Sequence, residues 1–285
     1  MNKKIIWILI FLILLVGLGS YLLINQDILR SFSESSIDFV EKNISKKVNT
    51  GGQPLRKDED DEGANLTVKG AISETNRHRI EAGLPELSEN TLLNIAAQKK
   101  VDDMFQRQYF EHDAPTGEGA GDLVTDTGYE FVVVGENLAL GNYKDDSVLV
   151  QAWMDSPGHR ENILKPAYTE IGIAVARGIF EGRETWLAVQ HFAKPISACP
   201  DINSNLKSEI SSNNERLDRL KIDLENMKKD LETKPTTQEE SDAYNKKVDQ
   251  YNDLVKEYNI LLDDTKVLVS QYNTQVQEFN QCAKE

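Results

Sequence analysis

Residues 153–164 (WMDSPGHRENIL) contain a histidine placed where it could do chemistry. Ser156 is a good helix N-cap and Pro157 fits the first helical position, so His159 falls in the first turn of a new helix. The positive end of the helix dipole disfavours an imidazolium there. A neutral imidazole is what a metal ligand or a hydrogen-bonding receptor requires. The alternative is that His159 is a packing residue beside Trp153.

Two further residues, His112 and Glu136, lie next to glycines or loops, where functional side chains tend to be presented. With His159 they supply two imidazoles and a carboxylate, a plausible ligand set for zinc or another divalent cation. No close-spaced signature such as H-E-x-x-H accompanies them. His78 lies between two arginines and is expected in solvent. His191 is expected to be structural, although strand alternation leaves open that it faces the site.

Five short blocks resemble, in their order, the bacterial type of the CAP superfamily, also called SCP-like proteins, over residues 67–195. The blocks are Asn76-x-x-Arg79 with Gly83-Leu84-x-x-Leu87, YFEH (109–112), GENLA (135–139), WMDSPGHRENIL (153–164) and EIGIAVA (170–176). The resemblance implies an α-β-α sandwich with a cavity lined by two histidines and two acids. The matching positions here are His112, Glu136, His159 and, for the second acid, Asp155.

The second acid departs from the family pattern. The family places it on the helix that bears Trp153, where this sequence offers Asp155 or Ser156. Asp155 is one carbon shorter than glutamate and is displaced by one position. A looser site with two histidines and water is therefore expected, rather than a four-residue metal centre.

These residues permit three functional interpretations. The favoured one is a non-catalytic recognition module for a small ligand, a lipid or an envelope protein, in keeping with the superfamily's known partners. The first alternative is a metal-dependent hydrolase with Glu136 as general base on a zinc-bound water. A nucleophilic Ser156 with His159 as its base is less favoured, because an N-cap serine is explained by its backbone N–H partners. The second alternative is self-association or partner binding through residues 200–285.

The elements that would position the site follow from hydrophobic periodicity and cap signals. Helices are expected over residues 68–82, from a cap at Ser88 to about residue 106, and onward from a cap at Asp145 or Asp146. Strands are expected over residues 131–134, 171–177 and 185–192, the last two as a hairpin. Helices at both ends with strands between them predict an α+β domain with helices packed on a small antiparallel sheet.

The charge of the chain restricts its partners. The formal net charge is −15, which argues against nucleic acid because phosphate binding needs a basic surface. Residues 27–66 include the run KDEDDEG (57–63), which has too little apolar content to fold alone. The sequence therefore predicts a flexible acidic stalk over residues 27–66.

The N-terminus carries an uncharged apolar run over residues 5–24, preceded by Lys3 and Lys4. At about 1.5 Å per residue it spans roughly 30 Å, the thickness of a bilayer core. The two lysines favour a cytoplasmic N-terminus. We expect a signal anchor over residues 1–26 that holds a single-pass protein at the cell membrane with the remainder outside. Secretion after signal cleavage is the alternative.

Residues 200–285 have a different pattern from the rest of the chain. Apolar residues recur at alternating spacings of four and three on two arms, and Pro235 separates the arms. Cys199 and Cys282 lie at the two ends of this unit, and in an exported chain they are expected to pair. The lengths of the arms predict a disulfide-closed antiparallel coiled-coil hairpin over residues 199–282. The alternative is two unpaired cysteines and a coiled coil formed between chains.

Overall fold

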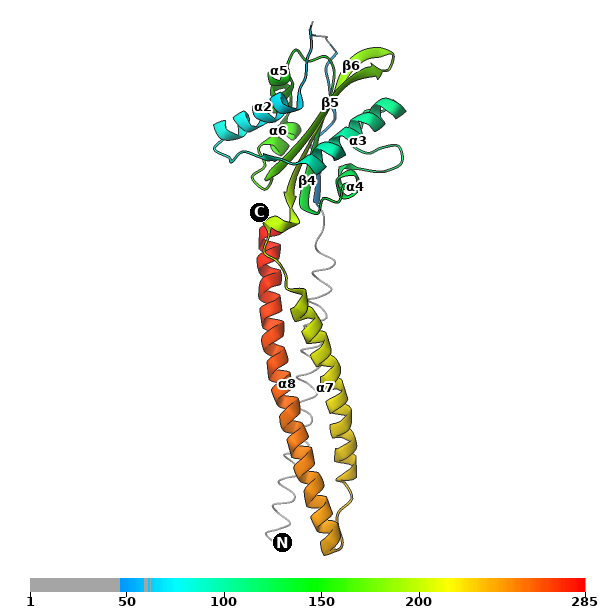
Figure 1. The fold of residues 1–285 in the computed structure, drawn as a ribbon, viewed down its shortest axis with the longest axis vertical. Coiled ribbons are helices and arrows are strands. Elements are labelled where there is room, and N and C mark those ends of the chain that lie inside the picture. Colours follow the sequence, from blue (N-terminus) through cyan, green and yellow to red (C-terminus); the bar gives the residue numbers. More distant parts are fainter. Residues whose placement is uncertain (1–46, 59–60, 62, 285) are drawn as a thin grey trace. The chain divides into compact units, whose positions relative to one another are not determined.

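The computed structural model describes residues 47–58, 61 and 63–284. These residues form two compact units, one running up to residue 200 and including the C-terminal residues from 281, and one that contains residues 201–280. Figure 1 shows a domain of helices and strands, and a pair of long helices. The first unit is the predicted α+β domain and contains every candidate cavity residue.

A mixed sheet organises this domain. Its central strands β4 (Phe131–Leu140), β6 (Arg183–Pro195) and β5 (Glu170–Phe180) are antiparallel, and β5 and β6 form the predicted hairpin. Three short strands pair in parallel at the two edges: β1 (Lys47–Thr50) and β2 (Leu55–Arg56) on β4, and β3 (Ser88–Glu89) on β5. The sheet is therefore antiparallel, as expected, only in its central strands.

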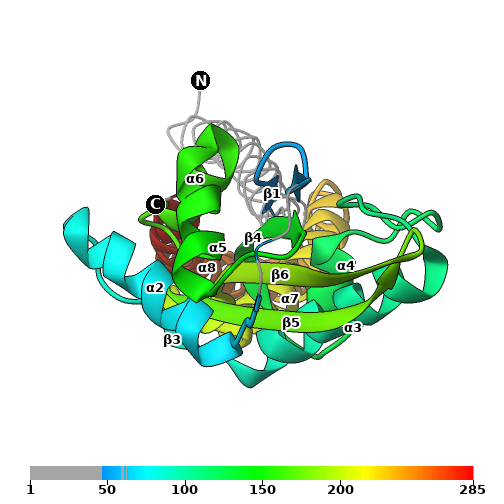
Figure 2. The ribbon, with the colours of Figure 1, turned by 90° about the horizontal axis from the view of Figure 1, so that it is seen from above.

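Helices cover both faces of the sheet. The first group is α2 (Val68–Glu81), α5 (Asp146–Asp155) and α6 (Pro157–Ile163), and the second is α3 (Thr91–Arg107) and α4 (Ala120–Thr125). Figures 1 and 2 show the two groups on opposite sides of the sheet. Successive strand residues alternate between the two cores: Ile173 packs with α2 and α5, and Ala174 packs with α3. This is the α-β-α sandwich implied by the resemblance.

The stalk prediction is wrong for residues 47–58. Lys47–Thr50 pairs with β4 from Val133 to Glu136, and Leu55–Arg56 pairs with Ala139 and Leu140. The acidic composition of residues 57–63 dominated the prediction, whereas the unpaired backbone groups along the edge of β4 decide the structure. The predicted cap at Ser88 is also wrong: Ser88 lies in β3, and Asn90 caps α3 by accepting from Leu92 N at 2.8 Å.

The block Asn76-x-x-Arg79 is structural. The Asn76 side chain bonds both the N–H and the carbonyl of Leu87. The Arg79 side chain is fully buried and donates to four main-chain carbonyls, those of residues 85, 163, 165 and 168. His78 is buried as well, contrary to the prediction of a solvated position, and burial lowers its pKa. It lies on the inward face of α2. The sequence prediction was misled by the two charged neighbours, which suggested an exposed stretch of helix.

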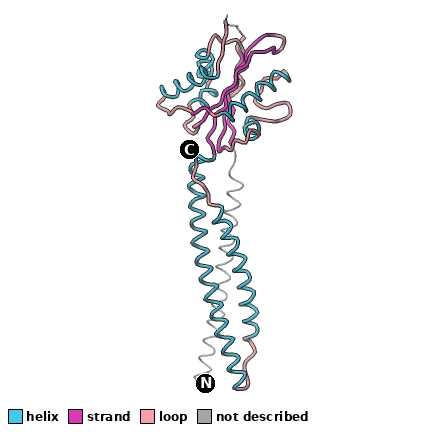
Figure 3. Tube along the Cα trace, viewed as in Figure 1, coloured by secondary structure: helices cyan, strands magenta, loops and turns pink. Residues whose placement is uncertain are grey.

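The second unit consists of two long helices, α7 (Ser204–Asp230) and α8 (Gln238–Lys284), which Figure 3 shows as helix throughout, joined by a loop. Pro235 lies in that loop, as predicted. Residues of both helices, among them Leu217, Leu224 and Tyr258, share one buried apolar cluster. The predicted disulfide between Cys199 and Cys282 is present, with an S–S distance of 2.05 Å. Supercoiling of the helices and self-association through them remain predictions.

The predicted membrane anchor lies outside the described residues. Within residues 47–58, 61 and 63–284, none of the helices combines the length and apolar character needed to cross a bilayer. The membrane anchor inferred from the apolar run at residues 5–24 therefore remains a prediction.

Candidate functional site

A buried carboxylate lies at the centre of the candidate site. Glu136 is on β4 and has no exposed surface. Its Oε1 lies 2.7 Å from His112 Nδ1, and its Oε2 lies 3.0 Å from His191 Nε2. His191 is also fully buried, while the side chain of His112 is 12% exposed. His112, Glu136 and His191 are called the His–Glu–His cluster below.

The contacts of His112 assign its protonation. Its Nδ1 faces the Glu136 carboxylate and its Nε2 lies 2.7 Å from the carbonyl oxygen of Gly52. Both partners are acceptors, so both ring nitrogens carry protons and His112 is an imidazolium. Burial alone would lower the pKa of His112, but the hydrogen bonds to Glu136 and Gly52 raise it above its ordinary value. The cluster thus contains a buried ion pair.

Glu136 is correspondingly held ionised. Burial raises the pKa of a carboxyl group, but hydrogen bonds from His112 and His191 outweigh burial and lower the pKa of Glu136 to about 2. His191 donates from Nε2 to the carboxylate, and its Nδ1 has no hydrogen-bond partner among the described residues. His191 is the cross-strand partner of Glu136, so it faces the site, the possibility that strand alternation left open.

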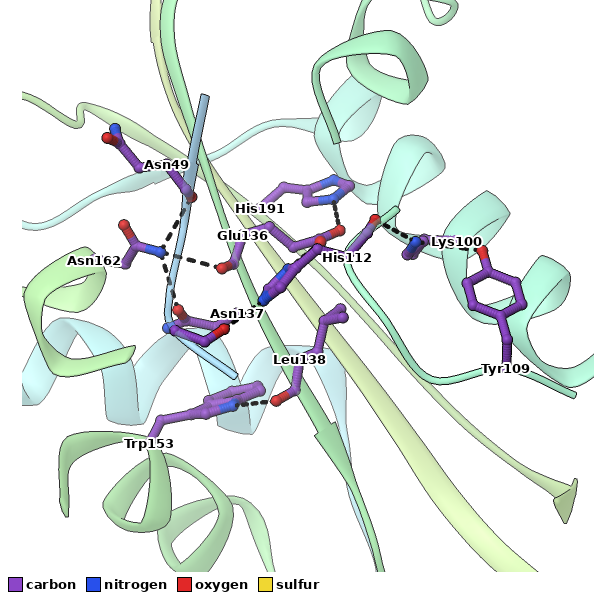
Figure 4. Close-up of polar contacts among 11 residues, drawn as sticks. Asn49, Lys100, Tyr109, His112, Glu136, Asn137, Leu138, Trp153, Asn162 and His191 are labelled. Carbon is purple, nitrogen blue, oxygen red and sulfur yellow. Dashed lines mark hydrogen bonds and ion pairs between the residues drawn. The ribbon is translucent and has the colours of Figure 1, made fainter. Parts of the chain in front are cut away.

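Asparagines of two sequence blocks fix the backbone around this cluster, as Figure 4 shows. Asn137 donates from Nδ2 to the carbonyl of His159 at 3.1 Å and to Gln190 Oε1 at 3.0 Å. Asn162 donates to the carbonyl of Glu136 and to Asn137 Oδ1, each at 3.1 Å. Asn137 and Asn162 therefore join β4 to α6.

His159 is placed near the start of α6, as predicted, and its partner is Ser156, the residue considered above for a nucleophile and base pair. Its Nδ1 lies 2.7 Å from Ser156 Oγ, and its Nε2 has no partner among the described residues. Ser156 stands at the N-cap position yet makes no capping hydrogen bond with its side chain, so that part of the prediction is wrong. Burial, with the charge of His112, lowers the pKa of His159 to about 4.

The four predicted cavity residues do not all come together. His112 and Glu136 are in direct contact, and His159 is tied to them through Asn137. Asp155 is exposed at the end of α5, where it accepts a hydrogen bond from Gln151 at 2.8 Å. It does not belong to the buried cluster, because the last turn of α5 turns this position to solvent.

Sequence reasoning missed a buried lysine behind the cluster. Lys100, on α3, is fully buried and donates to the carbonyl of His112 at 2.6 Å. It also lies 4.9 Å from the centre of the Tyr109 ring, and the Tyr109 hydroxyl donates to Asp103 at 2.7 Å (Figure 4 shows the Lys100 contacts). Burial lowers the pKa of Lys100. Because it holds the backbone of His112, we assign Lys100 a positioning role.

The comparison with family models agrees with this geometry. The model of the cysteine-rich secretory protein family, CAP, matches residues 72–192, a range that contains the whole His–Glu–His cluster. The chain contains a CAP domain of the bacterial type.

Two relatives are similar to part of this chain. The CAP region is 36% identical over 118 residues to the uncharacterized protein YkwD of Bacillus subtilis, covering 41% of this chain and 44% of YkwD. It is 31% identical over 109 residues to the uncharacterized membrane protein YlbC of the same organism, covering 38% of this chain and 31% of YlbC. The chain thus spans less than half the length of either relative.

Two solved structures are also similar to part of this chain. An extracellular protein containing a SCP domain from Bacillus anthracis is 28% identical, with a TM-score of 0.38, and the alignment covers 45% of this chain and 40% of that one. A cysteine-rich secretory protein from Staphylococcus aureus is 20% identical, with a TM-score of 0.35, covering 45% of this chain and 38% of that one.

The donors of the CAP site do not fit a zinc ion as they are arranged. Both Glu136 oxygens accept hydrogen bonds from imidazoles, and His112 has no lone pair left to offer. Within the part of the chain that the structure describes, no three His, Cys, Asp or Glu side chains are grouped as metal ligands. The prediction of a metal held by His112 and His159 therefore gains no support from this donor set.

We expect His159 to make the CAP domain sensitive to acid. The pKa of its imidazole is about 4 in the folded chain and about 6.5 when unfolded, so between these pH values only the unfolded chain binds the proton. This contribution is fully present above about pH 6.5 and is lost as the pH falls towards 4, by about 3 kcal/mol in all.

Urea denaturation at pH 7 and pH 4 measures this, comparing the wild type with His159→Gln. Carboxyl groups titrate in both chains, so their contribution cancels in the comparison. The free energy of unfolding should change between the two pH values by about 3 kcal/mol less in the variant than in the wild type, and this difference is the contribution of His159. Identical pH dependence in the two chains would contradict the assignment.

Proposed function

We propose that the chain is an extracytoplasmic recognition protein, whose CAP domain binds a ligand at the His–Glu–His cluster without hydrolysing it. The state of Glu136 carries this proposal. Its two oxygens are occupied by imidazoles and its pKa is about 2. A general base works best with a pKa near the working pH, so this carboxylate is a poor base towards water at neutral pH.

The serine-nucleophile alternative is weakly supported for a similar reason. Ser156 Oγ and His159 Nδ1 are within hydrogen-bond distance, at 2.7 Å. However, no acceptor among the described residues orients the ring from Nε2, and a histidine with a pKa of about 4 is a weak base. The pair is better explained as a contact that fixes the start of α6.

The location outside the cytoplasm rests on different features. The disulfide between Cys199 and Cys282 is a bond that persists in oxidising compartments. The apolar run at residues 5–24 supplies the proposed membrane anchor. The partner classes remain a small ligand, a lipid or an envelope protein, and the acidic chain disfavours nucleic acid. Partner binding through residues 200–285 is the competing function.

A binding screen with analysis of the recovered ligand tests this proposal. The full-length chain in detergent micelles is immobilised and exposed to peptidoglycan fragments, lipid vesicles and peptide pools, with binding followed by interferometry. We expect one ligand class to bind and to be recovered with its mass unchanged. Its affinity should fall at least tenfold in Glu136→Gln. Glu111→Gln removes an exposed carboxylate of the same charge and should bind like the wild type.

Two outcomes would overturn the proposal. Release of a cleaved ligand, with cleavage abolished in Glu136→Gln, would establish a hydrolase. Binding that survives Glu136→Gln unchanged would move recognition away from the cluster, to another surface such as the helical hairpin.

A further inference from the structure

We propose that the edge of β4 beside the His–Glu–His cluster is an acceptor groove for an extended peptide, and that residues 47–52 fill it as an internal ligand. The inference rests on the proposed function, because it assigns a ligand class to the same site. Residues 47–52 lie outside the residues that match the CAP family. They pair along the edge of β4, outside the range that the family model matches.

The contacts of residues 47–52 with β4 are mostly main-chain contacts. The segment runs parallel to β4, with Lys47 opposite Val133 and Thr50 opposite Glu136. The pairing continues past the strand, where Gly51 N donates to the carbonyl of Glu136 at 2.9 Å. Pairing of this kind gives affinity to any extended chain, and side-chain pockets then give selectivity.

The cluster itself binds a peptide carbonyl. His112 Nε2 donates to the carbonyl oxygen of Gly52, a group that every peptide offers. Selectivity comes from the residue before it. A Cβ atom on Gly51 would lie 2.2 Å from Asn137 Oδ1 and 3.1 Å from the carbonyl of Glu136, so glycine is required there. The expected ligand is an extended peptide with a glycine one residue before the carbonyl that His112 binds.

The neighbouring surface favours a basic or amino-bearing side chain. The side chain of Val48 is 43% exposed, and Val48 and Thr50 line an open cavity of about 470 Å³. Three carboxylates, those of Asp113, Asp122 and Asp126, line the same cavity. A ligand residue at the position of Val48 or Thr50 would face these exposed carboxylates, which attract a cation.

The next part of the segment is held differently, so residues 47–52 can exchange without the rest. Leu55 packs against the main core, and the Arg56 guanidinium lies 5.3 Å from the centre of the Phe110 ring and 5.6 Å from that of Phe180. Gly52 has a φ of +91° and marks the bend between the two parts. Side chains hold β2 to the domain, whereas β1 is held by its backbone pairing with β4 and by one side-chain hydrogen bond, from Asn49 Nδ2 to the Tyr168 hydroxyl at 3.1 Å.

The test uses a substitution that removes the internal ligand from the groove. In the full-length chain, Gly51→Val places a side chain against Asn137 and should displace residues 47–52. The probe is a fluorescein-labelled peptide with the sequence of residues 43–53, NISKKVNTGGQ, followed by anisotropy. We expect it to bind Gly51→Val at least tenfold more tightly than the wild type, whose groove is filled at a high effective concentration.

Two controls accompany this measurement. Thr50→Val adds a β-branched apolar side chain at the adjacent exposed position and should behave like the wild type. The probe peptide with valine in place of the glycine that corresponds to Gly51 should not bind either chain. Hydrogen exchange at the amides of residues 48–51 reports whether the segment has left β4.

Every other result overturns the inference. If the amides stay protected in folded Gly51→Val, the segment is not exchangeable, and if they are released without peptide binding, the groove is not an acceptor. Should Gly51→Val fail to fold, a benzophenone at the Val48 position of the peptide is used with the wild type. Cross-links should then map to residues 120–125, next to Val48, and their absence at millimolar peptide contradicts the inference.

Failure here is distinguishable from failure of the proposed function. A ligand that binds the wild type, depends on Glu136 and is not a peptide would leave recognition standing and remove only the peptide class. Loss of all Glu136-dependent binding would remove both.

Discussion

Glu136→Gln is expected to lower the free energy of unfolding of the CAP domain by about 3–5 kcal/mol, the usual result of removing one partner of a buried ion pair. Glu136 has no exposed surface and faces the His112 imidazolium. A neutral glutamine offers one oxygen where the carboxylate offers two. Either His112 or His191 then faces an amide N–H₂, and His112 must lose its proton or remain as an unpaired buried charge.

Urea denaturation followed by the fluorescence of buried Trp153 measures this loss. Glu111→Gln is the matched control, since Glu111 is exposed, and its effect should stay within about 0.5 kcal/mol. The pH dependence gives a second readout. Because the pKa of Glu136 falls to about 2 on folding, its contribution is present above about pH 4.5 and is lost as the pH falls towards 2. An unchanged free energy of unfolding in Glu136→Gln would refute the ion pair.

The sequence located the two central residues of the site but not their third partner. His112 and Glu136 were found because each lies in a recognisable block next to a glycine or a loop. His191 is opposite Glu136 only through the register of β4 and β6. Alternation along one strand leaves open which face of the sheet His191 lies on. Glu136 and His191 are 55 residues apart, and the register between their strands depends on the packing of the whole sheet. Local pattern could not decide between them.

The position of residues 47–52 was beyond sequence reasoning for a related reason. Their partners on β4 lie more than 80 residues away, and parallel pairing at an edge leaves no local signature. Composition pointed to a solvated stalk, as it would for most acidic segments. The helical hairpin shows the opposite case, because α7 and α8 follow from a heptad pattern that is local. There the two arms, the break at Pro235 and the disulfide were predicted.

Loss of the disulfide is the second large effect that we expect. Cys199 and Cys282 close a loop with a sequence separation of 83 residues, which contains both helices of the hairpin. In the chain-entropy description a cross-link of this length stabilises the folded form by about 4–5 kcal/mol at most, by restricting the unfolded chain. The hairpin should be the part most affected, because the cross-linked loop contains α7 and most of α8, which share an apolar cluster.

Thermal melting followed by helical circular dichroism tests this expectation in the wild type, with and without reductant, and in the double variant Cys199→Ala/Cys282→Ala. Reductant should lower the melting temperature of the helical transition in the wild type and leave that of the variant unchanged. The transition seen by Trp153, which is buried in the CAP core, should move much less than the helical one. If the helical transition does not respond to reduction, the apolar cluster alone holds α7 to α8. If the reduced transition depends on protein concentration, association between copies supplies the stability that the disulfide no longer provides.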